Sequence, residues 1–307
     1  MSTEGNQGEG DRYLAARIRE GDEDAFRQLV DRFAGRLRAY ALRRLGSGSA
    51  DVEDALQETF LGILLNASRL DAVRSLEAYL FSILRNKLAD LGRRGPRAHG
   101  MVAMPFGAGS ESSPGLDPPA LGVTPSHHVR REEATALRRE VLADVLTEAL
   151  AGLKQEKAFR DLKVLELLFY GGWKGKDAAA AALTSEPTVT RIRAEAIERL
   201  ARLARRHPRS DPSLAIFEGD EDTSGLLSQV WRENMLSCLK RSTLGAYSLG
   251  VLEPDWKDYA AFHLETVRCE VCAANLDDIR AGEASSRKVR DRLFASSIGF
   301  LRKGKPK

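Results

Sequence analysis

The chain has 307 residues, of which 30% are charged, with 47 Lys and Arg against 44 Asp and Glu and a formal net charge of +3. This length predicts two or three domains. Hydrophobic residues make up 43% of the chain, and no run approaches the ~20 apolar residues of a spanning helix, which excludes the membrane class. The polar N-terminus, 1–11, lacks the apolar stretch of a secretion signal, so we expect a cytoplasmic protein.

Apolar residues recur at helical spacing in three segments, and no strand alternation, repeat or phosphate-binding glycine motif accompanies them. We therefore predict an all-α protein, with two small helical domains joined by a flexible linker and a small C-terminal helical domain. The predicted segments are a first helical domain at 12–94, a Gly-, Pro- and Ser-rich linker at 95–128, a second helical domain at 129–206, a linker at 207–224, a domain with Cys and His at 225–281, and a basic tail at 282–307.

The helix predicted around Asp51–Phe60 has an unusual polar face. Opposite its apolar stripe lie acidic and amide groups beside a leucine: Asp51, Asp54, Gln57, Glu58 and Leu61. This mixture is typical of a protein interface, where polar groups set the register and an apolar group supplies burial. A solvated helix face is the alternative interpretation.

The order of motifs in the first segment resembles the extracytoplasmic-function branch of the sigma-seventy family of transcription initiation factors. Asp24-Ala25-Phe26 matches the first helix of that family, and Asp51 to Phe60 match its Asp-x-Glu-Asp-x-x-Gln-Glu-x-Phe motif. The run from Tyr79 to Asn86, followed by Asp90 and Arg93-Arg94, matches the next motif, with Tyr79 where the family usually has Trp. The resemblance implies that the Asp51–Phe60 helix binds the clamp helices of core RNA polymerase. It also implies that the following helix opens and reads the minus-ten promoter element.

A protein that reads melted DNA needs aromatic faces for stacking, an amide for base edges and positive charge for phosphates. The candidate minus-ten residues are Tyr79, Arg85, Asn86, Lys87, Arg93 and Arg94, with Phe81 as a second aromatic. Tyr79 and Phe81 also fit the apolar stripe of their helix, so a place in the core is the alternative for both.

A helix-turn-helix is predicted from Gly172 to Ala196, with Ser185 as the N-cap of the second helix and Pro187 in its first turn. Polar side chains lie off the buried stripe near the N-terminal end of that helix, which a recognition helix inserts into the major groove. The candidates are Ser185, Thr188, Thr190, Arg191 and Arg193.

The Ser185-x-x-Thr188-Val189 pattern resembles the fourth sigma domain, which implies reading of the minus-thirty-five element. Leu183 stands where that family usually has Gly. If the turn needs a positive φ there, leucine costs ~1 kcal/mol or more. A plain helical hairpin is the alternative fold, and a helix-turn-helix regulator that never binds polymerase is the alternative function.

All three cysteines lie in the last third of the chain. Cys238, His263, Cys269 and Cys272 supply three thiolates and one imidazole, which is a complete tetrahedral zinc set. The segment resembles the zinc-binding anti-sigma fold, although five residues separate His263 from Cys269 where that family has three. A metal-free helical version and a thiol switch are alternatives. The resemblance implies regulation in cis, or a regulatory protein that binds this domain.

The sequence therefore predicts a sigma factor that binds core RNA polymerase and promoter DNA and holds one zinc ion. We expect no enzyme activity and no membrane partner. A thiol oxidoreductase that uses Cys269 and Cys272 is the enzyme alternative, but no cofactor loop or catalytic triad accompanies that pair.

Overall fold

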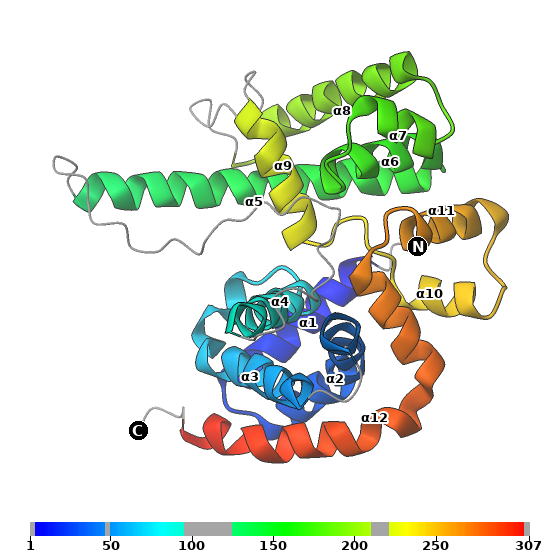
Figure 1. The fold of residues 1–307 in the computed structure, drawn as a ribbon. Coiled ribbons are helices and arrows are strands. Elements are labelled where there is room, and N and C mark those ends of the chain that lie inside the picture. The colour runs from blue at the N-terminus through cyan, green and yellow to red at the C-terminus, as the bar shows by residue number, and fades with distance from the viewer. Residues whose placement is uncertain (1–3, 47–49, 95–124, 210–220, 304–307) are drawn as a thin grey trace. The chain divides into compact units, whose positions relative to one another are not determined.

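A computed structural model describes residues 4–46, 50–94, 125–209 and 221–303 (Figure 1). Every regular element in these ranges is a helix and none is a strand, which confirms the all-α prediction. The chain forms two compact units, one from 1–102 with 238–307 and one from 103–237. The helices of the first unit are α1 (Glu4–Arg19), α2 (Glu23–Leu45), α3 (Asp51–Leu65), η1 (Ala67–Ala72), α4 (Leu76–Arg94), α10 (Arg241–Ser248), α11 (Pro254–Glu265) and α12 (Glu270–Lys303). Those of the second are α5 (Pro125–Gln155), α6 (Phe159–Leu165), the single π-helical turn η2 (Glu166–Tyr170), α7 (Gly175–Ala181), α8 (Glu186–Arg206) and α9 (Glu221–Glu233).

The apolar stripes of α2, α3 and α4 form the core of the first unit. Asp22 caps α2 by accepting from the backbone N–H groups of Asp24 and Ala25. Phe26, near the start of α2, meets Phe60, near the end of α3, with ring centroids 6.3 Å apart, so the two helices run antiparallel. The apolar residues of α2 that recur at three- and four-residue spacing are all buried: Phe26, Leu29, Val30, Phe33, Leu37, Tyr40 and Ala41.

The start of α4 is fixed by a residue of α1. The buried carboxylate of Asp11 accepts from the backbone N–H of Leu76 at 3.0 Å and pairs with Arg32 of α2 at 2.8 Å. The first N–H groups of a helix have no partner inside the helix, and a buried carboxylate is costly unless it is paired. Asp11 meets both needs, so it holds α1, α2 and α4 together.

Helix α12 runs antiparallel along α2 for most of its length. Arg44 and Arg43, at the end of α2, pair with Glu270 and Asp277 at 2.7 and 2.8 Å, whereas Arg27, near its start, pairs with Asp291 at 3.7 Å. Gly282 interrupts the helix with φ 71° and ψ 172°. The predicted basic tail therefore largely corresponds to the distal half of α12 (283–303), which is a helix packed on the first unit. Figure 1 shows this helix passing both α2 and α3.

Aromatic and apolar contacts hold the distal half of α12 in place. Phe294 packs on Phe26, with centroids 6.0 Å apart, and the Arg27 guanidinium lies 3.8 Å from the centre of the Phe294 ring. Leu293, Ser297 and Leu301, spaced four residues apart, are buried. This spacing places them on one face of the helix, which faces the unit.

The second unit has α9 as an integral part. Trp231 of α9 is fully buried, packs on Phe169 with centroids 6.3 Å apart, and donates its indole N–H to Ser237 at 2.9 Å. Arg232 donates to the backbone carbonyl of Tyr170 at 2.7 Å. The predicted Cys and His segment, 225–281, is therefore shared between the units, with α9 in the second and α10 to α12 in the first.

The predicted linkers coincide largely with residues outside the described ranges, 95–124 and 210–220. Helix α5 already begins at Pro125 and α9 at Glu221, four residues earlier than the predicted starts of their segments in each case. None of the described helices has both the length and the apolar character that crossing a membrane requires.

Candidate functional site

The five residues predicted to dock on polymerase share one face of α3. Asp51, Asp54 and Glu58 are exposed and Gln57 and Leu61 are half-exposed, while the apolar stripe of the helix is buried in the core. Glu58 pairs with Lys87 of α4 at 2.9 Å. The face is therefore accessible and acidic, with one apolar side chain, Leu61, at its C-terminal end.

Two side chains at the border of this face were not singled out from the sequence. Glu53 of α3 pairs with Arg292 in the distal half of α12. Both side chains are about half-exposed, and such pairs contribute little to stability. The contact nevertheless shows that α12 lies beside the docking face without covering its five predicted residues.

The candidate minus-ten residues lie along α4. Asn86 is exposed, Arg85 and Lys87 are half-exposed, and the exposed Arg93 pairs with Asp90. Tyr79 is half-buried. Phe81 is fully buried and meets Tyr40 edge to face at 5.3 Å, so the core interpretation holds for it. The side chain of Arg94 lies outside the described residues.

Helices α7 and α8 form the predicted helix-turn-helix. Ser185 caps α8 by accepting from the backbone N–H of Thr188, and Pro187 lies in the first turn, as predicted. Val189 and Ile192 are buried, while Thr190, Arg191 and Arg193 are exposed. Arg191 donates from Nη1 to both carboxylate oxygens of Glu195, at 2.7 and 2.8 Å, which raises the pKa of Arg191.

The turn between α7 and α8 has the backbone geometry expected from the sequence. Leu183 has φ 52°, and its side chain is 95% exposed. The turn therefore does use a positive φ at this position, and leucine here carries strain of about 1 kcal/mol that glycine would avoid. Two alanines, Ala178 and Ala179, are buried on α7, so this short helix contributes little apolar volume to the core.

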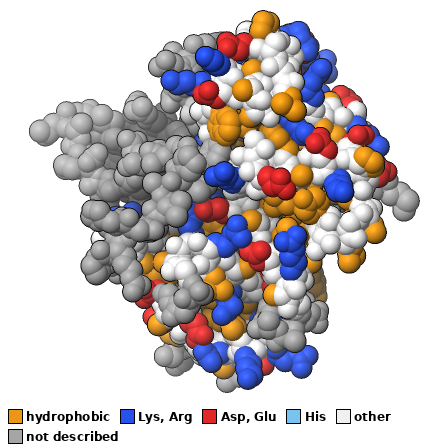
Figure 2. All heavy atoms as spheres, turned by 45° about the vertical axis from the view of Figure 1, so that its right-hand side comes forward, with side chains coloured by type: hydrophobic (Ala, Val, Ile, Leu, Met, Phe, Trp, Pro, Cys, Tyr) orange, Lys and Arg blue, Asp and Glu red, His pale blue; other side chains and the backbone are white. Residues whose placement is uncertain are grey.

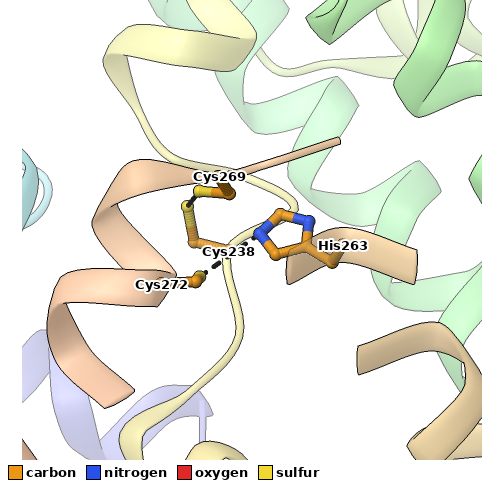
Figure 3. A group of neighbouring side chains, drawn as sticks. All are labelled: Cys238, His263, Cys269 and Cys272. Atoms are coloured by element: carbon orange, nitrogen blue, oxygen red, sulfur yellow. Dashed lines mark hydrogen bonds between the residues drawn. The ribbon is translucent and has the colours of Figure 1, made fainter. Parts of the chain in front are cut away.

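The Cys and His residues converge into one cluster (Figure 3). Cys238 precedes α10, His263 lies on α11, and Cys269 and Cys272 lie at the start of α12, with their potential ligand atoms all within 4.8 Å of one another. His263, Cys269 and Cys272 are buried and Cys238 is half-buried. Tetrahedral zinc with Zn–S bonds of ~2.3 Å places two sulfurs about 3.8 Å apart. The Sγ atoms of Cys238 and Cys269 are 3.6 Å apart, so the cluster fits a metal ion of this kind.

The long spacing between His263 and Cys269 is absorbed by the turn that joins α11 to α12. Arg268 adopts φ 55° there, and the backbone N–H of Cys269 donates to the carbonyl of His263 at 3.2 Å. As a result, Nε2 of His263 lies 3.2 Å from Sγ of Cys272. The departure from the family spacing therefore does not separate the histidine from the thiols.

Hydrogen bonds make the three thiols unequal. The hydrogen bond between the sulfurs of Cys238 and Cys269 lowers the pKa of Cys269 well below the usual value and raises that of Cys238 to about 12. Burial raises the pKa of Cys272, whose sulfur also accepts from the backbone N–H of Leu239 at 3.2 Å. The cluster therefore contains one thiol that is readily deprotonated, which is the form that binds metals.

With these sites described, the chain can be compared with known proteins. Residues 29–97 match the family described as sigma-70 region 2. The chain is 40% identical over 81 residues to the ECF RNA polymerase sigma factor SigF of Caulobacter vibrioides, which is 26% of this chain and 45% of the relative. It is also 40% identical over 88 residues to the RNA polymerase sigma factor CnrH of Cupriavidus metallidurans, covering 29% of this chain and 46% of the relative.

A third similar protein is the RNA polymerase sigma factor NccH of Alcaligenes xylosoxydans xylosoxydans, 40% identical over 83 residues, or 27% of this chain and 44% of the relative. The chain thus spans less than half the length of these curated relatives. No solved structure matches the chain.

The region 2 match covers the docking and minus-ten candidates, because residues 29–97 contain α3 and α4. The helix-turn-helix and the Cys and His cluster lie outside the matched residues. On the face drawn in Figure 2, basic and acidic side chains are interspersed, in keeping with the small net charge.

Proposed function

We propose that the chain is a sigma factor that binds core RNA polymerase and directs it to promoters. The observation that carries the proposal is the region 2 match at 29–97, within which α3 keeps Asp51, Asp54 and Glu58 exposed over a buried apolar stripe. The relatives are named RNA polymerase sigma factors. In this proposal the α3 face binds polymerase, α4 reads the minus-ten element, and α8 reads the minus-thirty-five element.

Replacing Asp54 or Gln57 with alanine should weaken the binding of the full chain to core polymerase by about 10-fold each, the scale of a residue that dominates an interface. Neither side chain lies in the core, so the melting temperature should not change. Binding titrations with fluorescently labelled protein measure the affinities, and melting curves measure the melting temperatures. Glu265→Ala on α11 and Gln28→Ala on α2 are matched controls, because both side chains are exposed on other helices.

Transcription in vitro with purified core polymerase and genomic template tests the proposal as a whole. We expect mapped start sites that depend on the added chain and that weaken with Asp54→Ala. If no start site rises above background, the sigma function is refuted. If DNA is bound without any polymerase binding, the alternative of an ordinary helix-turn-helix regulator is correct.

We further propose that the Cys and His cluster binds one zinc ion. Three thiols and an imidazole within 4.8 Å support this assignment, as does their burial. Zinc has no redox chemistry of its own in such a site, and its role there is to crosslink the ligands. The bound ion would join Cys238, ahead of α10, to α11 and α12.

The C-terminal segment is proposed to regulate the chain in cis or to receive a regulatory protein. Its extensive packing supports the first possibility, because α9 belongs to the second unit and α12 lies along α2 and α3 of the first. Ending the chain at Ser210 should therefore change promoter-dependent transcription. Unchanged activity, together with an unchanged response to stimulus, would contradict a regulatory role.

A further inference from the structure

Two ion pairs with the same spacing lie along the predicted recognition helix α8. Arg191 donates from Nη1 to both carboxylate oxygens of Glu195, at 2.7 and 2.8 Å. Further along the helix, Arg202 donates from Nη1 to Glu198 at 2.7 Å. Both pairs join residues four apart, but in the first pair the arginine comes before the glutamate, and in the second it comes after it.

Helix stability explains the second pair better than the first. An acidic residue four positions before a basic one stabilises a helix more than the reverse order does, in keeping with the helix dipole. Glu198 and Arg202 have the favourable order, whereas Arg191 and Glu195 have the reverse. The side chains of Arg191 and Glu195 are also about half-exposed, so their pair contributes little to stability. A role in binding is therefore the better explanation for the first pair.

Arg191 lies on the outward face of α8. Val189 and Ile192 are buried, whereas Pro187 and Ala194 are exposed. Arg191 follows Pro187 by four residues and precedes Ala194 by three, so these three residues share one side of the helix. This side belongs to the N-terminal half of α8, the part that a recognition helix inserts into the major groove. In the proposed function, Arg191 is therefore placed to contact base edges.

The contact with Glu195 leaves Nε and Nη2 of Arg191 for DNA. Within the described residues, the hydrogen bonds of Arg191 engage Nη1 alone. Nε and Nη2 form one edge of the planar fork, and two such donors match the O6 and N7 acceptors of guanine. A guanidinium that is already held loses less conformational freedom on binding. The carboxylate also repels phosphate oxygens, so it disfavours a contact of Arg191 with the DNA backbone.

We propose that Glu195 is a positioning residue that directs Arg191 to a guanine in the minus-thirty-five element. The inference rests on the proposed function, in which α8 reads that element. Arg191 supplies the contact with the base, and Glu195 acts through Arg191 by fixing its guanidinium and by opposing a phosphate contact. The pair thereby raises the selectivity of α8 for sequence rather than its total affinity for DNA.

The test is the selectivity of the full chain, bound to core polymerase, for promoter duplexes taken from mapped start sites. Each base pair of the minus-thirty-five element is replaced in turn, and the affinities are measured by competition. For the unaltered chain, we expect one G·C pair whose replacement weakens binding by about 10-fold, the effect of a bidentate contact. Arg191→Ala should remove this selectivity. Glu195→Gln replaces one acceptor by a donor and should reduce the factor to about twofold, while DNA without the element binds more tightly.

Glu198→Gln is the matched control, because it removes the same charge from the same helix but releases Arg202 instead of Arg191. It should leave the selectivity unchanged. In a chain that already contains Arg191→Ala, adding Glu195→Gln should have no further effect on selectivity, because the glutamate acts through the arginine. A merely structural role of Glu195 would not give this dependence. Melting curves confirm that each variant is folded.

The possible results separate this inference from the function on which it rests. If Arg191→Ala loses selectivity and Glu195→Gln retains it, Glu195 does not position Arg191, and the sigma function stands. If Glu198→Gln loses selectivity as much as Glu195→Gln does, the effect is one of helix charge and the inference is overturned. If start sites depend on the chain but no base pair of the minus-thirty-five element matters, α8 does not read that element and the inference fails, while polymerase docking stands. If the unaltered chain gives no start sites, both fail.

Discussion

Cys272→Ser should remove tight zinc binding from the full chain. The sulfur of Cys272 lies 3.2 Å from Nε2 of His263, and both residues are fully buried. Serine is a poor zinc ligand because its hydroxyl remains protonated. We expect an affinity loss beyond the roughly 100-fold that outer-shell partners of metal ligands control. Competition with a chromophoric chelator measures the affinity, and mass spectrometry under native conditions measures the metal content.

The same substitution should loosen α12. Cys272 lies one turn before Asn275, whose amide donates to Glu77 at the start of α4 at 3.1 Å. Metal ligation orders the residues that supply the ligands, and its binding energy becomes folding energy. Hydrogen exchange should therefore become faster in α11 and in the first turns of α12. A further expectation is that the melting temperature of the first unit falls.

His207→Ala is the control for this experiment. His207 bonds to Asp144 at 3.2 Å within the second unit and is not part of the cluster, so its loss should leave the metal content unchanged. A Cys272→Ser protein that retains one zinc ion with unaltered affinity would show that Cys272 is not a ligand. An unaltered chain that takes up no zinc would favour the metal-free version of the domain.

The parts of the fold that were predicted correctly depend on residues close together in sequence. The cap of α8 by Ser185 and the position of Pro187 in its first turn both follow from a few neighbouring residues. The polar face of α3 follows from its helical period. These signals are local, so a single sequence contains them in full.

The parts that were not predicted are long-range polar contacts. Asp11 reaches Leu76, which is 65 residues away, and Glu77 accepts from both Arg36 and Asn275, the latter 198 residues away. No periodicity or spacing in the sequence indicates such contacts, because folding can bring together polar groups from any two parts of the chain. The side chain of Arg36 is only 7% exposed, and its ion pair with Glu77 offsets the cost of burying its charge.

The role of the basic tail was missed for a related reason. Residues 282–307 were predicted only as a basic tail, because Lys and Arg are frequent there. In the structure those charges are used in contacts with α2 and α3: Arg290 with the carbonyl of Asp31, Asp291 with Arg27, and Arg292 with Glu53. A stripe of Leu293, Ser297 and Leu301 was the available signal, and the serine at its centre weakened it.

In the candidate sites too, local features were predicted from the sequence and long-range features were not. The sequence placed the docking residues on one helical face because α3 is a regular helix with a clear period. It also gave the four potential metal ligands, but not their proximity, since that depends on the conformation of Arg268 in the turn after α11. The number of residues between two ligands does not show whether a turn of the backbone brings their side chains together.

Trp231→Ala should destabilise the second unit by about 3–5 kcal/mol, the usual cost of removing a large aromatic side chain from a core. The ring is fully buried against Phe169, and Ser237, also buried, loses the indole N–H as a donor. Hydrogen exchange should become faster in α9, η2 and the part of α5 that α9 covers. Helices α2 to α4, which belong to the other unit, should keep their protection.

Trp256→Ala is the matched control, because this half-exposed tryptophan of α11 belongs to the first unit and packs edge to face on Tyr259, with ring centroids 6.2 Å apart. Its loss should cost less and should affect α11 rather than α9. Zinc affinity should be unchanged in Trp231→Ala, since none of the four candidate ligands lies on α9. Faster exchange in both units to the same extent would mean that they unfold as one. Unchanged exchange in α9 would mean that Trp231 does not anchor that helix. The predicted result, loosening of α9 with the cluster intact, would show that the C-terminal segment has two separate attachments, one to each DNA-reading unit of the proposed sigma factor.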